Sequence, residues 1–234
     1  MLYLILIFYI LYRWTHPPKI RHVLNVYFGV PGAGKTTLAA YFTKQANKQA
    51  WIIAYCEKHP GKISSWILKS KYWKRRLSVY SNVPITGAYK LDPQHDIGKY
   101  MIVNSKVIID EAGIEYNNRS FKTFPPEAIY WYKYHRHYEC SVEVFSQSHE
   151  DMDITLRRLA QNYFVVKKSL IPFCVCFRRI YRKVGIDENT HQIVDMYYFK
   201  PLGIGSKWIF SPPLWKLFNS YSRKELKEKE WEVW

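Results

Sequence analysis

The 234-residue sequence has only four cysteines, Cys56, Cys140, Cys174 and Cys176, and it contains no C-x-x-C pair. Zinc knuckles are commonly built from such pairs, whereas the spacing of Cys174 and Cys176 suits two side chains on one face of a strand. A disulfide framework is typical of much smaller secreted chains. The cysteines therefore indicate buried or free thiols in a reducing compartment.

Acidic residues are also few. The 19 Asp and Glu residues stand against 35 Lys and Arg, which gives a formal net charge of +16 and a pI of about 9.6. Such a charge attracts polyanions, and it does not choose among nucleic acid, anionic lipid, nucleotide or a merely solvated basic surface. Apolar residues make up 48% of the chain, which excludes a disordered protein, and the length suits one α/β domain with a modest extension.

Long apolar runs are rare, and the uncharged stretch 1–12 stands out. As a helix it would rise only about 18 Å, against a hydrocarbon core of about 30 Å. It lacks the features of a cleaved signal, and the basic residues after it favour a cytoplasmic body. We expect a hydrophobic membrane segment at 1–16 and a linker at 17–23. The alternative is a first strand that packs on the domain.

The remaining sequence alternates between two kinds of segment, with no internal repeat. Strand-like runs occur at 24–28, 51–55, 107–109 and 142–145, and helix-like stretches occur at 36–47, 125–138 and 151–161. Such alternation predicts an α/β fold with a mostly parallel sheet covered on both faces. After residue 162 the segments 163–166, 173–181 and 192–199 are rich in β-formers. We therefore expect an α/β domain at 24–168 and a basic, β-rich extension at 169–234.

A glycine-rich turn separates the first strand from the first helix and matches G-x-x-x-x-G-K-[ST]. Its glycines let backbone N–H groups approach phosphate oxygens, and the helix that follows points its positive end at them. In such a loop the lysine reaches the β- and γ-phosphates of ATP, and the hydroxyl binds Mg²⁺. The expected nucleotide-binding residues are Gly29, Val30, Pro31, Gly32, Ala33, Gly34, Lys35, Thr36 and Thr37, with Thr36 also a metal ligand.

Acidic and polar residues follow two of the later strands. Asp110 and Glu111 come directly after the apolar run 107–109, at the strand end where ligands bind in parallel sheets. We expect Asp110 to hold Mg²⁺ as a Walker B aspartate does, and Glu111 to take a proton from the attacking water. Gln147, after the run 142–145, either orients that water or is a polar strand end in solvent.

Two arginines lie in the helix-like stretch 151–161, and they have two readings. Arg157 or Arg158 could reach a neighbouring subunit's nucleotide as an arginine finger. The alternative is an ordinary surface arginine or a contact to phosphate.

Taken together, these motifs resemble the zonula occludens toxin (Zot)-like ATPases, which include assembly proteins of filamentous phages. Order and spacing agree from about residue 24 to residue 166. The matching residues are Gly29–Thr36, Ser81-Asn82-Val83-Pro84, Val107–Glu111 with Ala112, Arg119, His135-Arg136-His137, Ser146-Gln147, Asp153, and Arg157 with Leu159.

The resemblance implies a P-loop NTPase with a RecA-like, additional-strand sheet, related to the FtsK/HerA DNA pumps. It implies ATP and Mg²⁺ as cofactors, Gln147 as the sensor, and Arg157 as the arginine after the sensor strand. It also implies assembly at the host inner membrane, with the ATPase domain in the cytoplasm, and ATP-driven extrusion of phage DNA. One departure is that many phage relatives place their membrane segment after the ATPase domain.

The partners that follow are single-stranded DNA, a membrane, copies of the chain in a ring, and phage coat or channel proteins. The basic and aromatic segments 66–76 and 130–137 suit strand binding by charge and base stacking, or else belong to the core or a membrane interface. Two other functions stay open. One is a nucleotide-gated membrane scaffold for virion assembly, and the other is a pump for double-stranded DNA in packaging or conjugation.

Overall fold

The computed structural model describes residues 22–69, 77–116, 125–186 and 193–219, so the expected membrane segment 1–16 lies outside it. Within this part of the chain nine strands form one sheet, in the order β3-β2-β4-β5-β1-β6-β7-β8, with β9 also paired to β7. No helix among the described residues combines the length and apolar character needed to cross a bilayer.

The half of the sheet that contains β1 is parallel. Its strands are β1 (Leu24–Phe28), β2 (Ser78–Ser81), β3 (Tyr89–Lys90), β4 (Ser105–Ile109), β5 (Ser141–Ser146) and β6 (Asn162–Lys168). β7 (Cys174–Ile186) pairs antiparallel to β6, and its other edge pairs with β8 (Ile193–Tyr198) and β9 (Ser206–Phe210). The mostly parallel α/β sheet predicted from the sequence is thus confirmed.

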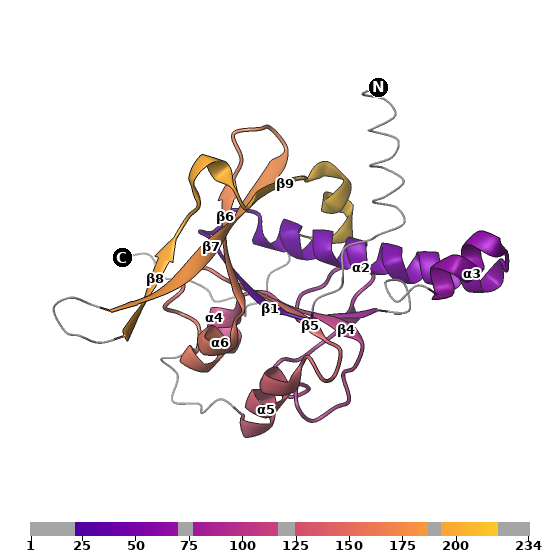
Figure 1. Ribbon diagram of the computed structural model, residues 1–234, viewed down its shortest axis with the longest axis horizontal. Coiled ribbons are helices and arrows are strands. Elements are labelled where there is room, and N and C mark those ends of the chain that lie inside the picture. Colours follow the sequence, from indigo (N-terminus) through magenta and orange to yellow (C-terminus); the bar gives the residue numbers. More distant parts are fainter. Residues whose placement is uncertain (1–21, 70–76, 117–124, 187–192, 220–234) are drawn as a thin grey trace, which may run out of the picture.

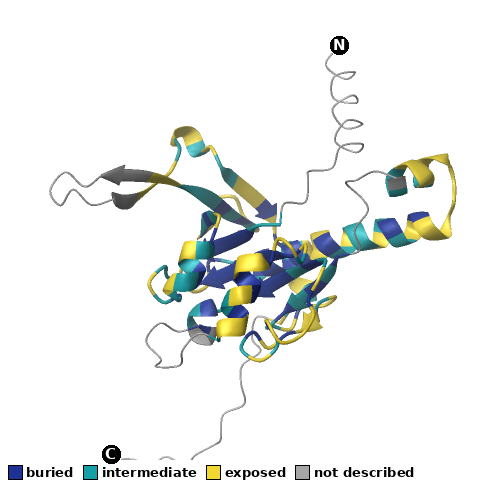
Figure 2. Ribbon diagram, turned by 60° about the horizontal axis from the view of Figure 1, so that its bottom comes forward, coloured by how far each residue is buried: buried dark blue, intermediate teal, exposed yellow. Residues whose placement is uncertain are grey.

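Helices cover both faces of the parallel half (Figure 1). One face carries α2 (Lys35–Lys58), and the other carries α4 (Ala112–Glu115), α5 (Pro126–Tyr134) and α6 (Ile154–Leu159). Central strands buried on both sides should read as continuous apolar runs, and every residue of β1 is buried. Figure 2 shows the buried residues concentrated in these strands. The core therefore has two halves, built around Val26 on the α4–α6 side and Tyr27 on the α2 side.

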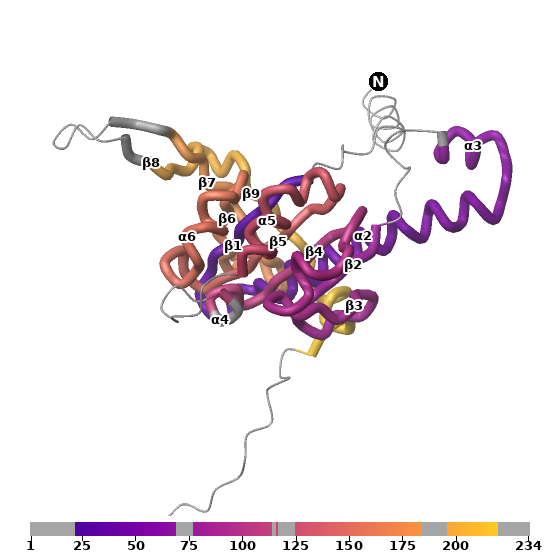
Figure 3. Tube along the Cα trace, turned by 90° about the horizontal axis from the view of Figure 1, so that it is seen from below, coloured from indigo at the N-terminus to yellow at the C-terminus, as the bar shows by residue number. Residues whose placement is uncertain are grey.

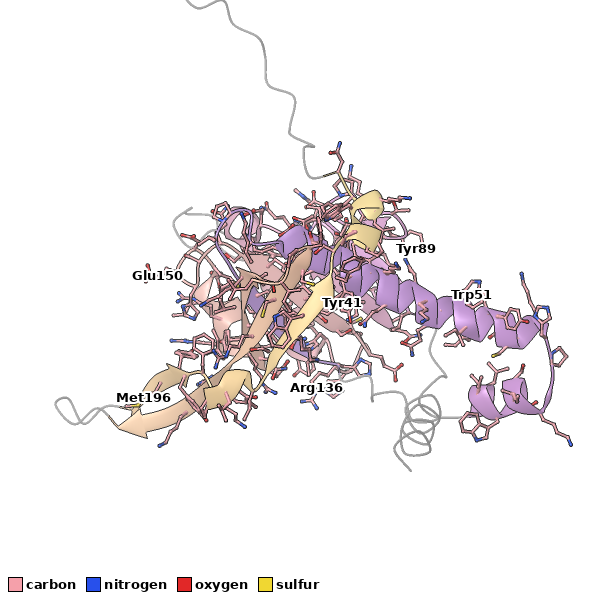
Figure 4. The ribbon with its side chains drawn as sticks, turned by 90° about the horizontal axis from the view of Figure 1, so that it is seen from above. Tyr41, Trp51, Tyr89, Arg136, Glu150 and Met196 are labelled. Carbon is pink, nitrogen blue, oxygen red and sulfur yellow. The ribbon has the colours of Figure 1, made fainter. Side chains whose placement is uncertain are left out.

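The predicted strand at 51–55 is wrong, because these residues continue α2 to Lys58. A five-residue apolar run suits a buried strand or a helix equally well. Here Trp51 is 65% exposed and Tyr55 50% exposed, and only Ile53 of the run is buried. The outer part of α2 projects beyond the sheet and is followed by α3 (Lys62–Lys69), with Trp51 on the projecting part (Figures 3 and 4).

The other elements differ from the prediction mainly at their ends. α5 stops at Tyr134 rather than 138, and α6 is shorter than the expected stretch 151–161. The strand β9 was not predicted. It follows the short helix η1 (Pro201–Gly203) and leads to η2 (Pro212–Leu217), where prolines and glycines dominate the local pattern. β7 and β9 continue the sheet beyond Lys168, so residues on both sides of the expected boundary share one sheet.

Candidate nucleotide-binding site

The glycine-rich loop lies where the sequence predicts it, between the end of β1 and the first turn of α2. Gly32 and Gly34 have φ of 73° and 99°, a region that favours glycine. A Cβ on Gly34 would lie 2.5 Å from Cγ2 of Val175, and one on Gly29 would lie 2.8 Å from the carbonyl oxygen of Val166. These glycines are therefore required both by the turn and by its close packing against β6 and β7.

Within the loop the lysine is turned inward. Lys35 is 6% exposed, and its Nζ donates to the carbonyl oxygens of Gly29 at 2.8 Å and Val30 at 3.3 Å. Thr37 is also buried, in the first turn of α2. The loop tip itself faces solvent, since Val30 is 70% exposed and Pro31 and Gly32 are exposed as well. The inward amine and the open tip together match a cradle for an anion that enters from solvent.

The loop and the first acidic residue meet directly. Thr36 Oγ1 donates a hydrogen bond of 2.8 Å to Oδ2 of Asp110, across 74 positions in the sequence. The strands that carry them are not neighbours, because β5 lies between β1 and β4. This inserted strand is the arrangement that the resemblance to additional-strand ATPases implies.

The contact between Thr36 and Asp110 suits a magnesium ion. Burial raises the pKa of Asp110, and the hydrogen bond from Thr36 opposes that rise. A buried carboxylate whose charged form is disfavoured gains from a cation beside it, and Mg²⁺ prefers oxygen ligands such as this hydroxyl and carboxylate. The donor set therefore fits the ion, and these two side chains are the ones that would hold it.

Asn82 positions the acidic strand end, a role that sequence reasoning missed. Its Oδ1 accepts from the backbone N–H of Asp110 at 2.7 Å, and its Nδ2 donates to the carbonyl oxygen of Asp110 at 2.8 Å. The two hydrogen bonds hold the peptide groups before and after the Cα of Asp110, and so fix the backbone that carries the carboxylate. The sequence did contain a signal, since Asn82 belongs to the Ser81-Asn82-Val83-Pro84 element, but the signal gave no role.

Glu111 and Gln147 also come together at this edge. Gln147 Nε2 donates to Oε2 of Glu111 at 3.1 Å. Glu111 has φ of 52°, a left-handed conformation that is uncommon outside glycine and often found at functional sites. The N–H of Gly29 donates to the carbonyl oxygen of Ser146 at 3.2 Å, which ties the start of the loop to the strand end before Gln147.

Comparison with solved structures identifies a shared fold. The N-terminal domain of zonular occludens toxin from Neisseria meningitidis superposes with a TM-score of 0.51 and 16% identity, over 84% of this chain and 98% of that one. The genome packaging NTPase B204 from Sulfolobus turreted icosahedral virus 2, in complex with AMP, gives a TM-score of 0.43 and 13% identity, over 80% of this chain and 100% of that one. No protein-family model matches the sequence, and no curated protein matches it significantly.

The chain has a Zot-like fold. The likeness extends over nearly the whole toxin domain, and it confirms the fold that the resemblance of motifs implied. Arg119, one of the matching positions, lies outside the described residues.

In this Zot-like fold Arg157 lies beside His149, near the end of the strand that leads into the loop. Its Nη1 is 3.3 Å from Nδ1 of His149, whose ring packs against Phe28 at the end of β1, with centroids 5.2 Å apart. Its carbonyl oxygen accepts a hydrogen bond from the hydroxyl of Tyr163. Arg158 is exposed on the same helix. Arg157 is thus one side chain removed from the loop's strand, and its role as an arginine finger stays a prediction.

The first histidine of the His135-Arg136-His137 element has a structural place in the Zot-like fold. His135 is 1% exposed, its ring Nδ1 lies 2.6 Å from the carbonyl oxygen of Tyr132, and its own carbonyl accepts from Cys140. It therefore closes the end of α5 and joins it to β5. Arg136 is exposed and extends from the body in Figure 4.

The two basic and aromatic segments that the sequence predicts for binding single-stranded DNA contain both buried and exposed aromatic residues. In 130–137, Trp131 and Tyr132 are buried, while Tyr130 and Tyr134 are exposed with ring centroids 4.5 Å apart. In 66–76, Trp66 is 46% exposed and residues 70–76 lie outside the described part. The aromatic pattern of 130–137 thus reflects core packing in part.

Proposed function

We propose that this chain hydrolyses ATP and uses the energy to move viral DNA during phage assembly. The observation that carries the proposal is the hydrogen bond between Thr36 and Asp110, which brings a phosphate-binding loop and a buried carboxylate to one point. Glu111 and Gln147 lie at the same edge of the sheet. A Zot-like ATPase fold around this edge supports the same function.

The residues divide the work of hydrolysis among them. The loop N–H groups and Lys35 would bind the β- and γ-phosphates, and Thr36 and Asp110 would hold Mg²⁺, which supplies charge neutralisation at the phosphates. Glu111 would accept the proton of the water that attacks the γ-phosphorus. Gln147, now bonded to Glu111, would keep that carboxylate oriented and respond when the γ-phosphate is present.

The finer proposal is a ring of these chains that extrudes single-stranded DNA of a filamentous phage through the host inner membrane, together with coat or channel proteins. Its support is the resemblance of motifs, the net charge of +16 and the apolar stretch 1–12. The arginine finger that the resemblance assigns to Arg157 belongs to this finer proposal, and in the single chain Arg157 lies beside His149.

ATP turnover of the purified full-length chain tests this proposal, measured alone, with single-stranded DNA and with duplex DNA. We expect turnover that single-stranded DNA stimulates more than duplex does. Stimulation mainly by duplex would support the double-stranded DNA pump instead. Nucleotide binding with no effect of DNA on turnover would support the nucleotide-gated scaffold and contradict the motor.

A further inference from the structure

The strands beyond the parallel half carry a strong excess of one charge. The segments 162–183 and 196–219 contain no acidic residue. Their basic residues are Lys167, Lys168, Arg178, Arg179, Arg182, Lys183, Lys200, Lys207 and Lys216. Because the segments pair into neighbouring strands of one sheet, this part of the molecule is basic on both faces, and a basic region favours a polyanionic partner.

The pairing register sorts these residues onto two faces. Val175 and Phe177 point into the core beneath α2, so alternate residues of β7 point the other way. On that outward side Cys176 pairs with Lys167 and Trp208, and its neighbours on the strand follow the same alternation. We define the outer face of β7 as these outward positions with their paired and adjoining side chains: Cys174, Cys176, Arg178, Ile180, Arg182, Lys167, Tyr197, Phe199, Trp208 and Phe210.

One end of the outer face is a basic cavity. It has a volume of about 200 Å³ and is lined by His149, Ile154, Arg157, Arg158, Tyr163, Arg182 and Tyr197. Nε of Arg157 and Nε2 of His149 are buried, with no hydrogen-bond partner in the described part of the chain. The cavity is smaller than the ~300–1,000 Å³ of typical small-molecule sites. It suits a single phosphodiester group, whose oxygens accept from arginine.

The ring of His149 can donate to an anion in this cavity, because its Nε2 has no hydrogen-bond partner among the described residues. Burial lowers the pKa of His149, and the positive charge of Arg157 lowers it further. A phosphodiester would stabilise the protonated ring beside it. The wall opposite is aromatic, with the rings of Tyr163 and Tyr197 in an edge arrangement 5.7 Å apart.

The other end of the outer face exposes aromatic rings. Trp208 is 55% exposed, Phe210 58% and Phe199 42%. The guanidinium carbon of Arg178 lies 4.9 Å from the centroid of Phe199. Large planar side chains interleaved with basic ones match the way single strands are held, by base stacking on rings and phosphate contacts between them.

The length of the outer face also fits a strand. Arg182 and Cys174 are eight residues apart, which is about 27 Å at ~3.4 Å per residue. The exposed rings along this distance are those of Tyr197, Phe199, Trp208 and Phe210, and such planar surfaces are ones on which bases can stack.

The inner side of β7 contacts the nucleotide loop. Cγ2 of Val175 fills the place where Gly34 would carry a Cβ, at 2.5 Å. A ligand that shifts β7 from its outer face would therefore press on the loop through Val175. From these observations we propose that the outer face of β7 binds single-stranded nucleic acid, with a phosphodiester in the cavity and bases stacked toward Trp208. This inference rests on the proposed function and names where that function's DNA binds.

Binding of a short fluorescein-labelled oligothymidylate to the full-length chain, measured by anisotropy, tests the proposal. Trp208→Ala should weaken binding at least about fivefold, since one stacked base is lost. Trp215→Ala is the matched control, because Trp215 is 52% exposed but lies on η2, and it should bind as the unmodified protein does. Lys167→Glu should weaken binding and its salt dependence more than Lys183→Glu, which changes an exposed lysine on the opposite face.

Each outcome decides the inference. Equal binding by the Trp208 and Trp215 variants would overturn it, and so would tighter binding of duplex than of single strand. Loss of binding to anionic phospholipid vesicles in the Trp208 variant, with oligothymidylate binding intact, would assign the face to a membrane and also overturn it. DNA-free ATP turnover is scored separately. If the unmodified protein has no DNA-free turnover, the proposed function fails. If all four variants keep both DNA-free turnover and strand binding unchanged, only the inference about the outer face of β7 is rejected.

Discussion

Asn82 shows how a single amide can fix the backbone beneath a carboxylate, here that of Asp110, which is the proposed ligand of Mg²⁺. Its side chain bonds both the N–H and the carbonyl of Asp110, at 2.7 and 2.8 Å. The carboxylate is then held toward Thr36 by the backbone on which it stands. Because the peptide is already fixed in this way, binding of an ion at Asp110 would require little further ordering of the backbone.

Replacing Asn82 should therefore reduce catalysis more than stability. We expect Asn82→Ala to lower ATP turnover about 10–100-fold and to raise the magnesium concentration for half-maximal turnover. Asn47→Ala is the control, because Asn47 on α2 also donates to a backbone carbonyl, that of Gly87, which is not part of the site. Turnover and magnesium dependence that match this control would show that Asn82 does not position Asp110.

The sequence predicted the residues of the site better than their supports. The loop 29–37 and the pair Asp110 and Glu111 could be read from motifs, because each motif is local and its chemistry dictates its residue types. The role of Asn82 could not, since it depends on β2 lying beside β4, 28 positions away. His135 shows the converse, because a polar motif residue proved to be a buried helix end.

At the scale of elements, hydrogen bonds between polar side chains link neighbouring strands of the sheet. Glu143 on β5 is 3% exposed and accepts from Asn25 at 2.9 Å, from Tyr27 at 3.0 Å and from Lys106 at 2.9 Å. Asn162 on β6 then donates to Asn25 at 2.8 Å. Each of these hydrogen bonds between strands fixes the register of two neighbouring strands, because a slip of one residue would move the polar side chains to the opposite face of the sheet.

Lys106→Ala should destabilise the fold, because it leaves the buried carboxylate of Glu143 without its cation. We expect a loss of about 2–4 kcal/mol in the free energy of unfolding, measured by denaturant titration. The side chain of Lys106 is 17% exposed, which places the cost toward the lower end. Lys133→Ala, which changes an exposed lysine on α5, should alter the free energy of unfolding by less than about 0.5 kcal/mol. Equal effects of the two substitutions would mean that the ion pair contributes nothing.

The types of elements could be predicted where their pattern was long or flanked by glycine and proline. The run 51–55 failed because five apolar residues fit both a strand and a helix, and in the structure only Ile53 of the run is buried, on one side of α2. β9 was missed because its burial depends on β7, a partner distant in sequence, and only Ile209 of its five residues is buried.

At the scale of the whole molecule, the two halves of the sheet have different tasks in this account. The parallel half holds the loop, Asp110 and Glu111 at one edge, and the antiparallel strands beyond β6 extend from it with their basic and aromatic face. β7 belongs to both, because its inner face packs on Gly34. The described residues thus form a single unit in which a nucleotide and a strand can influence each other. The membrane segment 1–16 and the domain boundaries stay predictions.

The most direct test of the central claim measures nucleotide retention and turnover together, with magnesium present, in the unmodified protein, in Glu111→Gln and in Lys35→Ala. The account predicts that Glu111→Gln retains ATP while turnover falls about 10²–10⁴-fold, because only the proton acceptor is lost. Lys35→Ala should lose retention as well. An unmodified protein that fails to retain nucleotide with magnesium, or a Glu111→Gln variant that hydrolyses ATP at the unmodified rate, would contradict the account.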